Sequence, residues 1–257
     1  MDAFWSAPPV SRTLTALAFL QSALVFGGLL DGHLTLFLPK RIFQFPPEIW
    51  RLFSPFLLTG SGLSFFFDLY FMFTYSSSLE SGSPRFSIPG DFFTYVLFVG
   101  VVILLTAGYL LSNIILTHAL IIAFVYTFAQ DNRGRKVNYL FVTLPVELLP
   151  WAMLILNLVL SGWPAALCDG MGIIAAHLYD FLTRIYPTFG GGKNYIVTPG
   201  FVKKLFGADL RREEHRTYGM AYRPSQQPQR GPASSGWTSS LGGSWSGRGA
   251  GRRLGGD

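Results

Sequence analysis

Among the ionisable residues inside the long apolar stretches of this sequence, four stand out: Asp68, His118, His177 and Asp180. A charged group that leaves water without a partner costs free energy, so an ionisable residue in a membrane segment is a candidate for function by default. Asp68 follows three phenylalanines, and two interpretations are open for it. It is either a neutral or hydrogen-bonded acid that faces another helix, or a polar residue that lines a hydrated groove used by substrates.

Two short spacings near His177 could also matter. His177 and Asp180 are three residues apart, so they share one face of a helix, and Arg184 lies a further turn along it. This pattern indicates either a structural ladder of ion pairs or a site. Gly172 and Ala176 are small residues four apart, a spacing that lets a neighbouring helix backbone approach closely but that also occurs by chance.

Trp50 and Arg51 stand just before the second apolar stretch. Trp favours the headgroup layer of a membrane and Arg extends its charged tip toward it, so the pair indicates an interfacial anchor, a role compatible with a more specific one. The single cysteine, Cys168, cannot form an intrachain disulfide, and we expect a small buried residue there rather than a reactive thiol.

An aromatic residue, two glycines and a leucine stand near the end of the chain, at Trp245, Gly247, Gly249 and Leu254. In a segment rich in Gly, Ser and Arg, this pattern indicates an extended peptide that docks on a partner, with glycines that permit close backbone approach. The alternative is low-complexity sequence that touches nucleic acid without specificity.

Membrane helices are the elements that must position these residues. The 257-residue chain is 50% hydrophobic and only 13% charged, which places it outside the usual soluble range. Helices can cross lipid with every backbone group satisfied, whereas isolated strands cannot. Apolar stretches of roughly the 17 to 25 residues that a membrane helix needs predict an all-α membrane protein with six transmembrane helices, at about residues 10–30, 54–75, 92–110, 112–128, 142–160 and 165–186.

An even number of crossings puts both termini on one side of the membrane, and the basic residues indicate the cytosol. On this topology three of the 20 basic residues, Lys40, Arg41 and Arg51, fall on the opposite side. The first loop, at about residues 31–53, is then lumenal.

The sequence divides into three parts. We expect a membrane domain over residues 1–189 and a juxtamembrane segment over 190–215, where apolar residues flank Lys203 and Lys204 and favour contact with the anionic cytosolic leaflet of the lipid bilayer. Over residues 216–257 Gly, Ser, Pro, Gln and Arg dominate, which predicts a disordered cytosolic tail.

Several short motifs of this chain together resemble those of the derlins, over about residues 8–206. They are Pro8-Pro9-Val10, Ile49-Trp50-Arg51-Leu52, Phe65-Phe66-Phe67, Leu79-Glu80, Leu148-Leu149-Pro150-Trp151 and His177-Leu178-Tyr179.

The resemblance implies a rhomboid-like six-helix bundle in the endoplasmic reticulum membrane that serves retrotranslocation of misfolded client proteins for degradation. It implies that Trp50 and Arg51 belong to a characteristic lumenal loop, and that Gly172 opens a helix-packing motif whose second glycine is replaced by Ala176. It also implies a ubiquitin ligase complex of that membrane as a partner, with no cofactor and no metal, and leaves homo- or hetero-oligomers open.

Active rhomboids place a nucleophilic serine at the start of the fourth helix and a histidine on the sixth. By the resemblance, Ala119 stands where that serine would fall and His177 is the retained histidine, so we expect a pseudoprotease and not an enzyme. Two rival functions are an intramembrane protease that uses an unrecognised serine with His177, and a transporter or channel organised around Asp68 and His118.

The residues Trp245, Gly247, Gly249 and Leu254 also resemble the SHP box through which derlins recruit the hexameric AAA+ ATPase valosin-containing protein. Two arginines inserted before Leu254 depart from the compact form of that motif.

Overall fold

The computed structural model describes residues 5, 7–42, 44–88, 90–139, 142–189 and 196–206. The chain divides into two units, Met1–Glu214 and His215–Asp257, and all of the described residues belong to the first. The predicted tail therefore lies outside the described residues.

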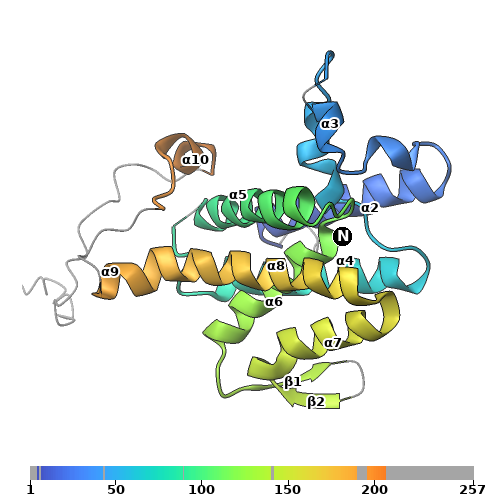
Figure 1. The fold of residues 1–257 in the computed structure, drawn as a ribbon. Helices are drawn as coiled ribbons and strands as arrows, with labels where there is room; N and C mark the ends of the chain where they lie inside the picture. Colours follow the sequence, from blue (N-terminus) through green and yellow to red (C-terminus); the bar gives the residue numbers. More distant parts are fainter. Residues whose placement is uncertain are drawn as a thin grey trace, which may run out of the picture. The chain divides into compact units, whose positions relative to one another are not determined.

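Long helices make up most of the described chain (Figure 1). They are α2 (Pro9–Phe26), α4 (Leu63–Gly82), α5 (Asp91–Ile103, continued by a π-helical segment Leu104–Leu110), α6 (Thr117–Asp131), α7 (Leu149–Ser161) and α8 (Trp163–Asp180, continued by a π-helical segment Phe181–Ile185 and α9, Tyr186–Phe189). The shorter elements are α3 (Pro39–Ile42), α10 (Gly200–Leu205), strands β1 (Lys136–Tyr139) and β2 (Val142–Pro145), and 3-10 turns at Gly32–Leu34, Ile49–Leu52, Ser54–Phe56 and Val146–Leu148.

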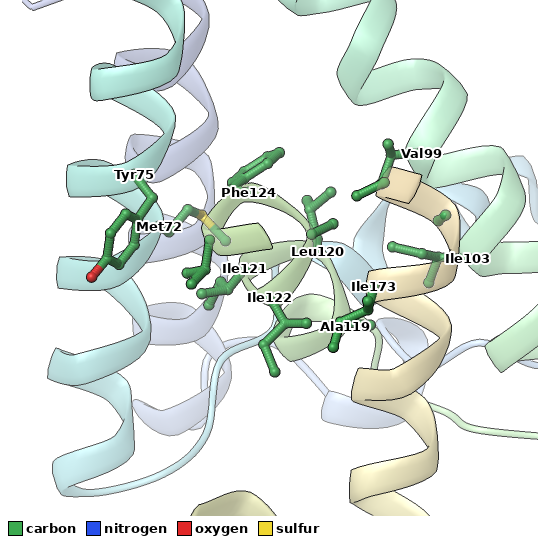
Figure 2. Close-up of a cluster of buried hydrophobic side chains, with 14 of the residues drawn as sticks. Met72, Tyr75, Val99, Ile103, Ala119, Leu120, Ile121, Ile122, Phe124 and Ile173 are labelled. Atoms are coloured by element: carbon green, nitrogen blue, oxygen red, sulfur yellow. The ribbon is translucent and has the colours of Figure 1, made fainter. Parts of the chain in front are cut away.

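The core of the fold surrounds α6. Every residue from 119 to 125 is buried, and a helix that is apolar on all sides needs protein around it. Helix α6 packs against α4, α5, α7 and α8. Figure 2 shows Met72 and Tyr75 of α4 on one side of α6, with Val99 of α5 and Ile173 of α8 on the other. The position of α6 at the centre fixes which side chains of the surrounding helices meet.

Membrane-length helices are present, as the apolar stretches predicted. In the described part of the chain, three helical runs are long and apolar enough to cross a membrane: Pro9–Phe26, Asp91–Leu110 and Trp163–Phe189. The run Val146–Ser161 is apolar but shorter. Helices α4 and α6 also occupy predicted stretches, but α4 ends in Ser and Glu residues and α6 has 15 residues.

The second predicted helix begins later than expected. Residues 54–75 were expected to be one helix, whereas the structure has a 3-10 turn at Ser54–Phe56, an irregular segment, and α4 only from Leu63. Gly62, just before α4, has φ +66°, a left-handed conformation that glycine adopts without a steric cost. The prediction of a helix over residues 54–62 is therefore wrong.

The irregular segment before α4 satisfies its backbone through neighbouring elements. The carbonyl of Pro55 accepts a hydrogen bond from the N–H of Leu116 at 2.9 Å, and the carbonyl of Leu58 accepts one from the Thr117 hydroxyl at 2.6 Å. On the other side, the Ser22 hydroxyl of α2 accepts from the N–H of Thr59 at 3.0 Å. Irregular backbone at membrane depth is tolerated where protein groups satisfy it in this way.

The fourth and fifth predicted helices also start later. Ser112 has φ +56°, which interrupts the expected helix at residues 112–128 so that α6 begins at Thr117. Residues 142–145 form β2 rather than the start of a helix, because they pair antiparallel with β1, with Tyr139 opposite Val142 and Lys136 opposite Pro145. These two boundaries are corrections to the sequence-based prediction.

Helix α10 packs against the start of α5. Its Val202 is buried, and Val202 lies so close to Gly90 that a Cβ added there would come within 2.8 Å of the valine side chain. Phe206 contacts the ring of Phe93, with 5.6 Å between the ring centroids. The apolar stretch predicted around the paired lysines is thus a short helix held against α5.

Candidate functional site

A cavity of about 660 Å³ lies between α4, α6, α7 and α8. The walls come from these four helices and from the irregular segments around residues 58–60 and 113–115. Helices α4 and α7 border the cavity on two sides, but in the described chain they make little direct contact with each other. Phe67, Phe71, Met153 and Leu156 make part of the lining apolar. The cavity therefore lies between α4 and α7.

Three polar side chains from three helices meet in this cavity. His118 of α6 donates from Nδ1 to Oδ1 of Asp169 on α8, at 2.7 Å. Asn157 of α7 donates from its amide nitrogen to the other oxygen, Oδ2, at 2.7 Å. Asp169 is fully buried, whereas the His118 side chain is 34% exposed. Because the carboxylate engages Nδ1, the imidazole has a fixed orientation with Nε2 left for other partners.

Asp68 of α4 contributes a second carboxylate to the same cavity. It is 8% exposed, and its Oδ2 accepts a hydrogen bond from the N–H of Gly60 at 2.9 Å. Gly60 belongs to the irregular segment that replaces the first turns of the predicted helix. Across the described residues, no basic side chain forms an ion pair with Asp68. The two predicted cavity residues Asp68 and His118 are thus brought together, on different helices.

His177 and Asp180 do not line this cavity. His177 is exposed, and its Nδ1 lies 3.0 Å from the hydroxyl of Tyr126 on α6. Asp180 pairs with Arg184 at 3.2 Å, which is one of the contacts in the ladder interpretation, and with Arg85 at 2.7 Å. The four ionisable residues therefore do not form one groove. The helical register that places Asp169 opposite His118 carries His177 and Asp180 toward the other end of α8.

Arg85 joins the ends of two helices. This side chain comes from the turn after α4 and pairs with Asp131 at the end of α6 as well as with Asp180 at the end of α8. The hydroxyl of Ser83 donates to Asp131 at 2.6 Å. Because Arg85 is only 12% exposed and has carboxylates on two elements, this cluster holds the ends of α6 and α8 together.

Gly172 and Ala176 lie on the side of α8 that faces α6. A Cβ added at Gly172 would overlap the carbonyl oxygen of Ala119 and would come within 2.9 Å of its carbonyl carbon. Ala176 is 1% exposed and Ala119 is fully buried. The small residues thus stand where the two backbones nearly touch. His177 is not opposite Ala119, because Gly172 occupies that level of α8.

Arg51 is a buried residue of the first loop, at 1% exposure. Its guanidinium pairs with Glu48 and donates from Nη1 to the carbonyls of His33 and Leu36, each at 2.7 Å. Trp50, in contrast, is 52% exposed and donates from Nε1 to a loop carbonyl. The two neighbours therefore have different surroundings: Arg51 holds the loop together and Trp50 presents its ring outward.

Glu80 near the end of α4 caps the start of α2. Its Oε1 accepts from the N–H of Val10 at 3.0 Å, and its Oε2 accepts from the N–H of Ser11 at 2.7 Å. The first N–H groups of a helix have no partner within the helix, and a carboxylate also suits the positive end of the helix dipole. The Leu79-Glu80 motif of the sequence thus has a structural role.

Asp169 and Asn157 were missed by the sequence analysis. Asp169 lies inside the last predicted apolar stretch, residues 165–186, and the criterion that singled out Asp68, an ionisable residue in such a stretch, applies to it as well. Asn157 is an uncharged amide within an apolar run. Its position in the middle of that apolar run was the signal that could have identified Asn157 as a candidate site residue. The predicted docking residues Trp245, Gly247, Gly249 and Leu254 lie outside the described residues.

The sequence matches a model of the Der1-like family over residues 7–200. The chain belongs to this family. Among its relatives, Derlin-1 of Homo sapiens is 31% identical over 205 residues, which cover 74% of this chain and 79% of that protein. Derlin-1 of Arabidopsis thaliana is 33% identical over 204 residues, or 78% of this chain and 74% of that protein. Derlin-1 of Bos taurus is 32% identical over 215 residues, or 78% and 80%.

The predicted membership of the derlin family is thus confirmed. As a derlin, the chain is a multi-pass membrane protein of a family typical of the endoplasmic reticulum. Membership implies a role in retrotranslocation during endoplasmic-reticulum-associated degradation, with partners from that process. The family is regarded as non-catalytic.

Proposed function

We propose that this derlin is a nonenzymatic retrotranslocation factor that receives misfolded clients in the cavity between α4 and α7 and passes them to a cytosolic AAA+ ATPase. In this proposal α2, α4, α5, α6, α7 and α8 each cross the membrane in a rhomboid-like bundle, with both termini in the cytosol. A ubiquitin ligase complex of the same membrane acts on the emerging client.

The polar cavity is the observation that carries the proposal. Peptide groups cost several kcal/mol each, as an order of magnitude, when they enter dry hydrocarbon without partners. The cavity wall between α4 and α7 offers the hydrogen-bonding groups of four side chains: His118, Asp169, Asn157 and Asp68. A client segment in that cavity would replace some of its hydrogen bonds to water with hydrogen bonds to these groups. This replacement lowers the free-energy barrier to crossing the membrane.

The surroundings of Ala119 support a nonenzymatic role. Ala119 has no hydroxyl, and its backbone is in contact with Gly172, which leaves no room between them for a substrate carbonyl. His177 contacts Tyr126 rather than a serine. A nucleophile and its base must lie within hydrogen-bonding distance, whereas His177 lies five residues along α8 from Gly172, the residue that faces Ala119. Labelling by a serine-reactive fluorophosphonate that is lost in His177→Ala would favour the protease instead.

Photo-crosslinking from α7 tests the route of the client. Leu156 lines the cavity, whereas Ile155 on the same helix is 58% exposed and does not line it, so a photoreactive residue at each position gives a matched comparison. In microsomes that contain the full chain and a radiolabelled client, we expect client adducts from position 156 and few from position 155. Equal adducts from both positions would contradict a path through the cavity.

A further inference from the structure

The charges in the cavity do not balance. Asp169 has the His118 imidazole and the Asn157 amide as partners. Asp68 has the N–H of Gly60, a neutral donor, and no basic side chain of the described residues pairs with it. With both acids ionised and His118 protonated, the cavity has two carboxylates and one cation. Asp169 is fully buried and Asp68 is only 8% exposed, so a second positive charge would be attracted strongly.

We propose that the cavity recognises a basic side chain, Lys or Arg, carried by a membrane-buried segment of a client, and that Asp68 is its counter-ion. This inference rests on the proposed function and names the class of client that the same cavity selects. A transmembrane segment with an unpaired basic residue is costly in lipid, and a misfolded or unassembled membrane protein exposes such residues. The carboxylate of Asp68 would lower that cost.

The lining of the cavity fits the shape of these side chains. Lys and Arg combine a long hydrocarbon stem with a charged tip. Phe67 and Phe71 lie on the same helix as Asp68, one residue before it and three after it, and both line the cavity. Met153 and Leu156 line it from α7. A stem that enters between α4 and α7 would contact these apolar groups while its tip reaches Asp68.

A free metal ion fits this site less well. In the described part of the chain, no group of three or more His, Cys, Asp and Glu side chains is arranged to hold a metal. A small hydrated cation would also make no use of the phenylalanine, methionine and leucine walls. The observations favour a cation attached to an apolar stem, which a client segment supplies.

The test uses one single-span client in four versions, with Arg, Lys, Gln or Leu at the centre of the span. Each is synthesised in microsomes that contain the full-length chain, and adducts from a photoreactive residue at position 156 are measured. We expect the Arg and Lys versions to give on the order of tenfold more adduct than the Leu version, with Gln close to Leu.

Variants at position 68 identify the counter-ion. Asp68→Asn keeps the shape of the side chain and its acceptor oxygen for Gly60 but removes the charge, so the ratio of Arg-client to Leu-client adduct should fall toward one. Asp68→Glu keeps the charge and should preserve most of the preference. Asp31→Asn is the matched control. Asp31 caps a 3-10 turn in the first loop, and it does not line the cavity. It should leave the ratio unchanged.

Three outcomes would overturn this inference. Equal adducts from the Arg and Leu versions with the unmodified chain would show that charge is not recognised, while the adducts themselves would leave the proposed client route standing. A preference that survives in Asp68→Asn would exclude Asp68 as the counter-ion. If no version of the client forms adducts at position 156, the proposed function fails and the inference fails with it.

Discussion

His118 of α6 and Asp169 of α8 are joined by a hydrogen bond of 2.7 Å inside the membrane-helix bundle. The partners differ in exposure, because Asp169 is buried and His118 faces the cavity. Asn157 binds the second carboxylate oxygen, so one side chain on α8 connects α6 with α7. This connection holds three walls of the cavity at fixed positions.

A double-mutant cycle measures the strength of that connection. Asp169→Ala leaves the imidazole without its acceptor, and His118→Ala leaves the buried carboxylate with one donor fewer. We expect a coupling of about 1.5 to 3 kcal/mol between the two substitutions, the range for hydrogen bonds to charged groups. The measurement is the free energy of unfolding in detergent for the single and double variants. Additive effects would show that the pair contributes nothing jointly.

Gly172 and Gly170 form a matched pair for the contact between α6 and α8. Gly172→Ala places a methyl group against the carbonyl of Ala119, and we expect a loss of about 1 to 3 kcal/mol from overpacking. Gly170→Ala meets open space and should stabilise α8 by up to about 1 kcal/mol. Thermal unfolding of both variants in the same detergent provides the comparison. Similar midpoints for the two would contradict the close approach.

Substitutions at Arg51 and Trp50 distinguish the residue that holds the first loop together from the residue that presents its ring outward. Arg51→Ala removes the donor to the carbonyls of His33 and Leu36 and the partner of Glu48, at a cost of about 3 kcal/mol. We expect faster proteolysis within residues 31–53 and slower client degradation, with expression retained. Trp50→Ala should leave the proteolysis rate close to that of the unmodified chain, because its ring is half exposed. Normal client turnover in Arg51→Ala would count against a role for this loop.

The C-terminal motif gives a prediction that is independent of the membrane domain. Trp245→Ala combined with Gly247→Ala should reduce co-purification of the AAA+ ATPase by at least about tenfold, since aromatic anchors supply much of the energy of peptide docking. Membrane insertion should not change. Trp237→Ala, in the same tail but outside the motif, is the control. ATPase recovery that matches the unmodified chain would remove the docking proposal.

The sequence predicted the fold best where an apolar stretch could form only one kind of secondary structure. Runs such as residues 92–110 became a helix, with Asp91–Leu110 as the observed span, because no other element satisfies the backbone in lipid. Reasoning from the sequence failed over residues 54–62. There the carbonyls are satisfied by Leu116 and Thr117, which are about 60 residues away in the chain. No local pattern contains that information.

The cavity illustrates the same limit. Asp68 and His118 could be singled out because ionisable residues are conspicuous in apolar stretches. Their relation to Asp169 and Asn157 depends on the register between α6 and α8, and spacing within one helix does not fix that register. For the same reason the sequence does not show which residue of α8 faces Ala119, and in the structure that residue is Gly172 rather than His177.

The central claim is that this derlin moves clients across the membrane without cutting them. The most direct measurement is the recovery of a lumenal client, labelled at both ends, in the supernatant of microsomes supplied with ATP and the AAA+ ATPase. We predict full-length client in the supernatant, strongly reduced when the chain is depleted and restored when it is added back. Release of fragments that depends on the chain, or release unchanged by its depletion, would contradict the account.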